Sequence, residues 1–188
     1  MAIIGEGGVA SAVEAVRGGA DLVQVRAKHL TGRDLLALVR AVIEGTGDPS
    51  RVIVNSRPDI ANIAGAGGVH LPERSLPPAR VRLAFPALKI GVSRHDRNGL
   101  ESAEREGADY AMLGPVFETP GKEAAAIGVA RIRVLLAGLR LPVVGVGGID
   151  ESNARSAIEA GLAGVAGIRA FAGADGNGAR RLKSALNY

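Results

Sequence analysis

Short apolar runs alternate with amphipathic stretches along the whole chain. Eight of these runs have the length of strands, and the one at 141–146 is rich in β-branched residues, which favours a strand buried on both faces. They lie at residues 2–4, 21–26, 52–54, 68–71, 89–93, 109–113, 141–146 and 164–168. Apolar positions with helical spacing separate them. These predict helices at about 9–16, 34–43, 58–64, 79–83, 98–106, 129–136 and 151–160, with a closing helix at 179–186.

Strict alternation of strand and helix predicts a parallel sheet with right-handed crossovers. Five or six such units would form an open doubly wound sheet, whereas eight close into a barrel. The first strand is very short, and 188 residues is below the usual length of about 200 or more for a barrel. The count still favours the barrel. We therefore expect the α/β class and a single (β/α)8 TIM barrel, with residues 1–188 as one domain.

Glycines stand where the last two predicted strands end. The seventh ends in Gly147 and Gly148, where the backbone can turn sharply and its N–H groups can reach a ligand. Asp150 or Ser152 is expected to cap the following helix, whose amino terminus would attract an anion. The eighth strand ends in Gly167, and barrels of this kind build phosphate pockets after strands seven and eight. A valine at position 148 is then expected to occupy the place of the anion.

Composition limits the classes of ligand and the cellular compartments that are expected for this chain. The net charge is only +4 and aromatic residues make up 3% of the chain, so the basic stripe and stacking aromatics of a nucleic-acid binder are missing. No apolar run is long enough for a membrane span, and no signal peptide is visible. The absence of cysteine fits a cytoplasmic protein and excludes disulfides and thiolate metal sites. The oligomeric state is open, with a homo-oligomer among the alternatives.

Polar residues cluster at the carboxyl ends of the predicted strands, where barrels place their functional residues. These residues are Gln24, Arg26, Lys28, Asn55, Ser56, Arg57, His70, Glu73, Ser93, His95, Glu118, Thr119 and Lys122. Several are cationic and converge on one mouth. This pattern predicts a phosphate or pyrophosphate ligand.

Seven ordered motifs resemble those of the thiamine phosphate synthase/TenI family, whose fold is a (β/α)8 barrel. They span about residues 18–171 and are the segments 24–28, 54–59, 68–71, 91–95, 107–110, 114–122 and 145–149. The first reads Gln-Val-Arg-Ala-Lys and the sixth Gly-Pro-Val-Phe-Glu-Thr-Pro-Gly-Lys. The resemblance implies a small phosphorylated thiazole or pyrimidine as substrate.

One activity of this family is thiamine phosphate synthesis from hydroxymethylpyrimidine pyrophosphate and thiazole phosphate. The resemblance implies that the pyrophosphate is held by the residues matching the family's motifs, which are Arg26, Lys28, Asn55 and Lys122. The reaction also uses Mg²⁺, which the family holds with two aspartates. Ser56 and Ser75 stand at those positions here. Hydroxyls alone are poor Mg²⁺ ligands, so the sequence predicts no metal site.

The second activity is the metal-independent TenI-type tautomerisation of a thiazole carboxylate phosphate, which needs a general acid/base. The family's histidine position is Pro115 here, so His95 becomes the expected general base, with Glu118 assisting if it is partly desolvated. Lys122 completes the expected catalytic set. His70 is expected to be structural.

We favour the TenI-like, tautomerase-type enzyme without a cofactor. A Mg²⁺-dependent synthase and a non-catalytic protein that binds thiazole or thiamine phosphate are the alternatives. The expected substrate- and phosphate-binding residues are Gln24, Arg26, Lys28, Asn55, Ser93, Thr119, Gly147, Gly148 and Gly167.

Overall fold

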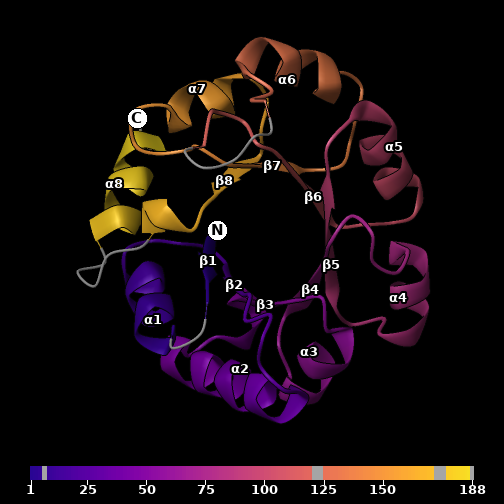
Figure 1. Ribbon diagram of the computed structural model, residues 1–188, viewed down its shortest axis with the longest axis vertical. Coiled ribbons are helices and arrows are strands. Elements are labelled where there is room, and N and C mark those ends of the chain that lie inside the picture. Colours follow the sequence, from indigo (N-terminus) through magenta and orange to yellow (C-terminus); the bar gives the residue numbers. More distant parts are fainter. Residues whose placement is uncertain (6–7, 120–124, 172–176, 187–188) are drawn as a thin grey trace.

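A ring of eight parallel strands surrounded by helices makes up the computed structural model, which describes residues 1–5, 8–119, 125–171 and 177–186 (Figure 1). Neighbouring strands follow sequence order. The strands are β1 Ala2–Ile4, β2 Val23–Val25, β3 Val52–Asn55, β4 Gly68–Leu71, β5 Lys89–Arg94, β6 Tyr110–Leu113, β7 Val143–Val146 and β8 Gly164–Ala166. The predicted (β/α)8 barrel is confirmed.

Helices cover the outside of the ring (Figure 1). The α-helices are α1 Val9–Arg17, α2 Gly32–Thr46, α3 Pro58–Ala64, α4 Pro78–Ala84, α5 Arg97–Arg105, α6 Val129–Leu136, α7 Ala154–Glu159 and α8 Asn177–Leu186. Two short 3₁₀ helices are η1 Pro49–Arg51 and η2 Arg169–Phe171. Across these described residues, no helix is long and apolar enough to cross a membrane.

The ring closes between its first and last strands. Ala2 pairs in parallel with Gly167. The Ile3 N–H donates to the Gly167 carbonyl at 2.9 Å, and the Gly167 N–H donates to the Met1 carbonyl at 3.2 Å. The very short first strand is therefore a full member of the barrel, and closure places Gly167 at the same mouth as the ends of the other strands.

Apolar side chains fill both sides of the strands. Most of the core lies between strands and helices, whereas Ile3, Tyr110, Met112 and Ala166 pack together inside the barrel. The Tyr110 ring occupies the space that a side chain at Gly91 would need. The bore is thus a packed interior and not a pore, as expected of this fold.

Polar side chains cap two of the helices at their amino termini. The Thr31 side chain accepts a hydrogen bond from the Asp34 N–H at 3.2 Å at the start of α2. The Asp96 carboxylate accepts one from the Gly99 N–H at 2.7 Å at the start of α5. Each cap satisfies a backbone donor that the helix leaves free.

The helix after β7 begins later than predicted, and the prediction that Asp150 or Ser152 caps it is wrong. Asp150 does not cap α7: its carboxylate accepts hydrogen bonds from the N–H and hydroxyl of Ser152, at 2.9 and 2.6 Å. These bonds stabilise a turn that delays the helix to Ala154. Because α7 has only six residues and starts away from the glycines, its dipole is not the source of an anion site there.

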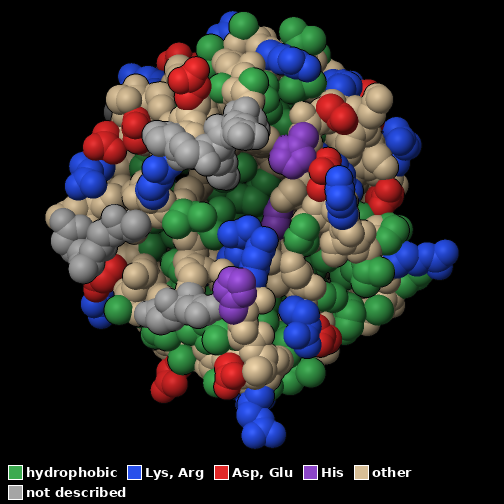
Figure 2. Space-filling view, in the orientation of Figure 1, with side chains coloured by type: hydrophobic (Ala, Val, Ile, Leu, Met, Phe, Trp, Pro, Cys, Tyr) green, Lys and Arg blue, Asp and Glu red, His purple; other side chains and the backbone are tan. Residues whose placement is uncertain are grey.

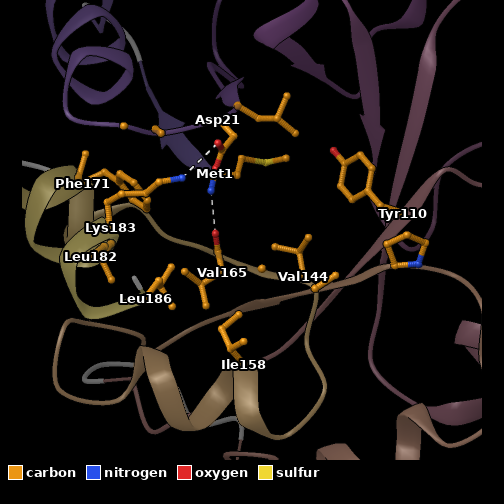
Figure 3. A pocket seen from close by; sticks show the side chains of 17 residues that line it. Met1, Asp21, Tyr110, Val144, Ile158, Val165, Phe171, Leu182, Lys183 and Leu186 are labelled. Atoms are coloured by element: carbon orange, nitrogen blue, oxygen red, sulfur yellow. Dashed lines mark hydrogen bonds and ion pairs between the residues drawn. The ribbon is translucent and has the colours of Figure 1, made fainter. Parts of the chain in front are cut away.

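A cavity of about 550 Å³ lies at the opposite end of the barrel, where the strands begin. Figure 3 shows mainly apolar side chains around it, among them Val144, Ile158, Val165 and Leu182. The Met1 ammonium donates to the Val165 carbonyl at 2.7 Å. This cavity lies away from the carboxyl ends of the strands, so it is distinct from the polar mouth.

Candidate active site

The carboxyl ends of the strands form a single mouth that gathers the predicted polar residues. The face shown in Figure 2 is hollowed at its centre, with Lys, Arg and His side chains along its walls. Because neighbouring strands pair in register from β1 to β8, residues that follow different strands meet there. The ring order places the end of β2 across the barrel from the ends of β6 and β7.

A cationic wall, formed by Arg26, Lys28 and Arg94, lies on the β2 and β5 side of this mouth. Arg26 and Lys28 are exposed on the loop after β2. The sequence analysis did not select Arg94. Its guanidinium donates to the Ser93 carbonyl at 2.7 Å and to the Gly99 carbonyl at 3.2 Å, which fixes it at the end of β5. The charges of Arg26 and Arg94 both act on His70 and lower its pKa, so these two residues lie near one another.

Two uncharged polar side chains are buried inside the barrel below this wall. Gln24 is 2% exposed, and its amide nitrogen donates to the thioether sulfurs of Met1 and Met112, each at 3.7 Å. His70 is 3% exposed and its Nε2 lies 2.9 Å from the Ser93 hydroxyl. Burial, followed by the charges of Arg26 and Arg94, lowers the pKa of His70 to about 4. His70 is therefore neutral near pH 7, which fits the structural role expected for it and excludes it as a base that titrates there.

His95 has the properties of an accessible imidazole. Its Nδ1 lies 2.7 Å from the Gly114 carbonyl, and a carbonyl can only accept, so the proton is on Nδ1. In neutral His95, Nε2 is then an unprotonated nitrogen in a half-exposed side chain. The Glu73 carboxylate lies 3.9 Å from this Nε2 and would pair with a protonated ring.

An amide cup, formed by the backbone of Gly147, Gly148 and residues 167–169, lies on the β7 and β8 side. These residues line a cavity of about 520 Å³. Within the described ranges, the N–H groups of Gly147, Gly148, Ile168 and Arg169 donate to no other group. Free backbone donors around one cavity are an anion-binding arrangement. The side chains of Arg169 and Arg181 also line it.

The prediction that a valine side chain at position 148 would occupy the place of the anion is wrong. Gly148 has a φ of 66°, which disfavours any side chain. A Cβ there would meet the carbonyl oxygen of Glu118 at 2.5 Å and that of Phe117 at 2.7 Å. The side chain would displace the chain's own loop instead of filling the place of the anion, so this substitution does not test the cup.

The loop after β6 joins the amide cup to the rest of the mouth. The Phe117 N–H donates to the Gly147 carbonyl at 3.0 Å, and Thr119 lies beside Gly147. Glu118 is exposed in the wall of the cup, so the desolvation expected of a catalytic acid is not present. Lys122 lies outside the described residues, and its role stays a prediction.

The groups at the expected magnesium position do not suit Mg²⁺. The Asn55 amide donates to the Ser56 hydroxyl at 2.7 Å, so these side chains bond to each other. Asp59 is bound by both ends of the Arg57 guanidinium, at 2.9 and 2.6 Å, which also lowers the pKa of its carboxyl. In the described ranges, no three His, Cys, Asp or Glu side chains gather as a metal site. Mg²⁺ is usually held by one or two carboxylates, and neither serine supplies one.

This architecture defines a class of protein. A closed (β/α)8 barrel with a cationic wall and an amide cup at one mouth is the architecture of an enzyme for phosphorylated substrates. The family described as thiamine monophosphate synthase matches residues 3–171 of this chain. The chain belongs to this thiamine phosphate synthase/TenI family, and the resemblance seen in its motifs is confirmed.

Relatives that match most of this chain are named as enzymes of thiamine phosphate. A thiamine-phosphate synthase of Methanoculleus marisnigri is 42% identical over 163 residues, 85% of this chain and 77% of that protein. One of Moorella thermoacetica is 39% identical over 178 residues, 92% and 85% of the two chains. The structure of thiamine phosphate pyrophosphorylase from Pyrococcus furiosus superposes with a TM-score of 0.89 at 30% identity, covering 98% and 94%. These relatives support the synthase alternative better than the tautomerase-type enzyme that we favoured from the sequence.

Acid should destabilise the fold through His70. Because its folded pKa, about 4, is below the ordinary value of 6.5, the unfolded state binds the proton more readily. Stability is therefore lost as the pH falls from about 6.5 to about 4, by roughly 3 kcal/mol. Urea unfolding of the protein and of His70→Gln at several pH values measures this. The difference in unfolding free energy between the protein and His70→Gln should shrink by that amount towards pH 4. A difference that stays constant with pH would refute the lowered pKa of His70.

A pair of substitutions at position 169 should isolate one backbone donor of the amide cup. Arg169 is the first residue of η2, a position at which proline fits and only the N–H is lost. Arg169→Ala removes the side chain and keeps the N–H, and it serves as the matched control. We expect Arg169→Pro to bind thiazole phosphate about tenfold or more weakly than Arg169→Ala in calorimetric titration. Equal affinities would show that this N–H does not hold the phosphate.

Proposed function

We propose that this protein is a thiamine phosphate synthase, joining hydroxymethylpyrimidine pyrophosphate to thiazole phosphate with release of pyrophosphate. The observation that carries the proposal is that cationic side chains and free backbone N–H groups lie on different sides of one mouth, which would give it two anion sites of different construction. The synthase has two phosphorylated substrates, whereas the tautomerase has one. The names of the relatives support the same choice.

The cationic wall suits the leaving group. In the reaction a thiazole nitrogen bonds to the methylene carbon of the pyrimidine, and the carbon–oxygen bond to pyrophosphate breaks with both electrons on the oxygen. Negative charge therefore grows on the pyrophosphate, and fixed cations that face it lower the barrier. Arg26 and Lys28 supply this charge in the proposal, with Asn55 as a neutral contact. Lys122 would add a further cation.

The amide cup suits the other substrate. It would hold the thiazole phosphate through the N–H groups of Gly147, Gly148, Ile168 and Arg169, with Thr119 beside them, whereas the N–H of Gly167 already donates to the Met1 carbonyl. Holding both reactants around one mouth turns a bimolecular encounter into a reaction within one complex. In the proposal, Gln24 on β2 and Ser93 on β5 would contact the pyrimidine and its pyrophosphate.

A thiazole tautomerase is the second candidate, favoured by one observation. His95 holds its proton on Nδ1 and leaves Nε2 open at the mouth, as a general base requires. The synthase step removes no proton at this position. Assaying both reactions with one preparation separates the candidates, because His95→Gln should abolish only the tautomerase.

Removing the charge of Arg26 should impair synthase turnover. Arg26→Met takes away a cation that would face the departing pyrophosphate, and we expect kcat/KM to fall about 100-fold or more. The matched control is Arg57→Met, since the Arg57 guanidinium is bound to Asp59. It should retain activity. Product formation from both substrates is the measurement, and no turnover by the unaltered protein would overturn the proposal.

Magnesium should have little effect on pyrophosphate binding by the unaltered protein. Ser56 and Ser75 provide hydroxyls where Mg²⁺ would need carboxylates. We therefore expect the cationic wall to neutralise most of the negative charge of the pyrophosphate. The double variant Ser56→Asp, Ser75→Asp should bind pyrophosphate at least tenfold more tightly with Mg²⁺ than without it. Calorimetry with and without the ion measures both affinities. Strong Mg²⁺ dependence in the unaltered protein would contradict the argument from its missing carboxylates.

A further inference from the structure

A buried hydrogen bond inside the barrel links two strands below the mouth. His70 on β4 and Ser93 on β5 face one another, with Nε2 and Oγ 2.9 Å apart. The other ring nitrogen, Nδ1, is buried and has no partner among the described residues. The Tyr110 ring packs beside the imidazole, with centroids 5.8 Å apart.

The unpaired nitrogen determines which one carries the proton. Burial keeps the imidazole neutral by lowering its pKa, so it has a single N–H. A proton on Nδ1 would be a buried donor without an acceptor, which folded proteins rarely tolerate. A proton on Nε2 is donated to the Ser93 oxygen, and only a lone pair on Nδ1 is left unpaired. The proton is therefore on Nε2.

This assignment fixes the direction of the serine hydroxyl. Because the Ser93 oxygen accepts from His70, its own hydrogen is free to be donated elsewhere. Ser93 is half-buried at the mouth, and its carbonyl accepts from the Arg94 guanidinium. Arg26 lies near enough for its charge to act on His70. An anion held by these two arginines would lie next to the serine hydroxyl.

We propose that His70 is a positioning residue that turns the Ser93 hydroxyl towards a pyrophosphate oxygen at the mouth. This inference rests on the proposed synthase function, because it assigns the pyrophosphate to the cationic wall. The charged and titratable groups facing His70 are Arg26, Arg94 and Tyr110. The pKa of the Tyr110 phenol is raised by burial, so none of them changes charge near neutral pH. The effect of His70 should therefore be independent of pH from about 6 to 8.

Two substitutions separate positioning from packing. His70→Gln keeps an N–H donor near the place of Nε2, whereas His70→Leu fills the space without a donor. Each is made alone and with Ser93→Ala, and inorganic pyrophosphate is titrated by calorimetry. We expect affinity within about threefold of the unaltered protein for His70→Gln and about tenfold weaker for His70→Leu. In the Ser93→Ala background the two should bind alike.

The outcomes decide between the two roles. Equal affinities for the Gln and Leu variants with Ser93 present, or the same difference without it, would overturn positioning, as would absent pyrophosphate binding by the unaltered protein. If His70→Leu does not fold, the ¹⁵N NMR shifts of the unaltered imidazole supply the test. They should show a protonated Nε2, and a protonated Nδ1 would overturn the inference. Pyrophosphate binding with this pattern but no synthase turnover would instead overturn only the proposed function.

Discussion

Closure of the barrel between β8 and β1 is the constraint on which the site depends. Two backbone hydrogen bonds at Gly167 join the last strand to the first. Without them the sheet would be open, and the ends of β2 and β8 would lie at distant edges. Closure brings the loops after all strands to one mouth, which the amide cup and the cationic wall share.

The two anion sites differ in how they are built, and the difference suits different ligands. The cationic wall uses the guanidinium and ammonium groups of side chains, with Arg26 and Lys28 on the exposed loop after β2 and Arg94 at the end of β5. The amide cup uses fixed backbone donors on short turns after β7 and β8. In the proposed reaction, the backbone donors would hold a phosphate that stays bound throughout, whereas the cations would stabilise the charge on a pyrophosphate that must leave.

The sequence predicts the strands well because each depends on a short local run of apolar residues, and each lies within its expected range or extends one residue past it. Its errors concern specific hydrogen bonds and close contacts that the apolar pattern does not encode. The start of α7 depends on a bond between Asp150 and Ser152 that competes with a helix cap. The strain at Gly148 depends on a loop 30 residues earlier. Arg94 was missed because its place at the mouth comes from the Gly99 carbonyl on α5.

The carboxylates near the mouth show how the site balances charge. Asp59 is bound by Arg57, and Glu73 lies beside His95. Where the resemblance implies metal-binding aspartates, Ser56 instead bonds with Asn55. Asp59 is therefore already bound by an organic cation, and Glu73 has a histidine as its neighbour. A pyrophosphate at this mouth would then be neutralised mainly by arginine and lysine, whose positions are set by the barrel itself.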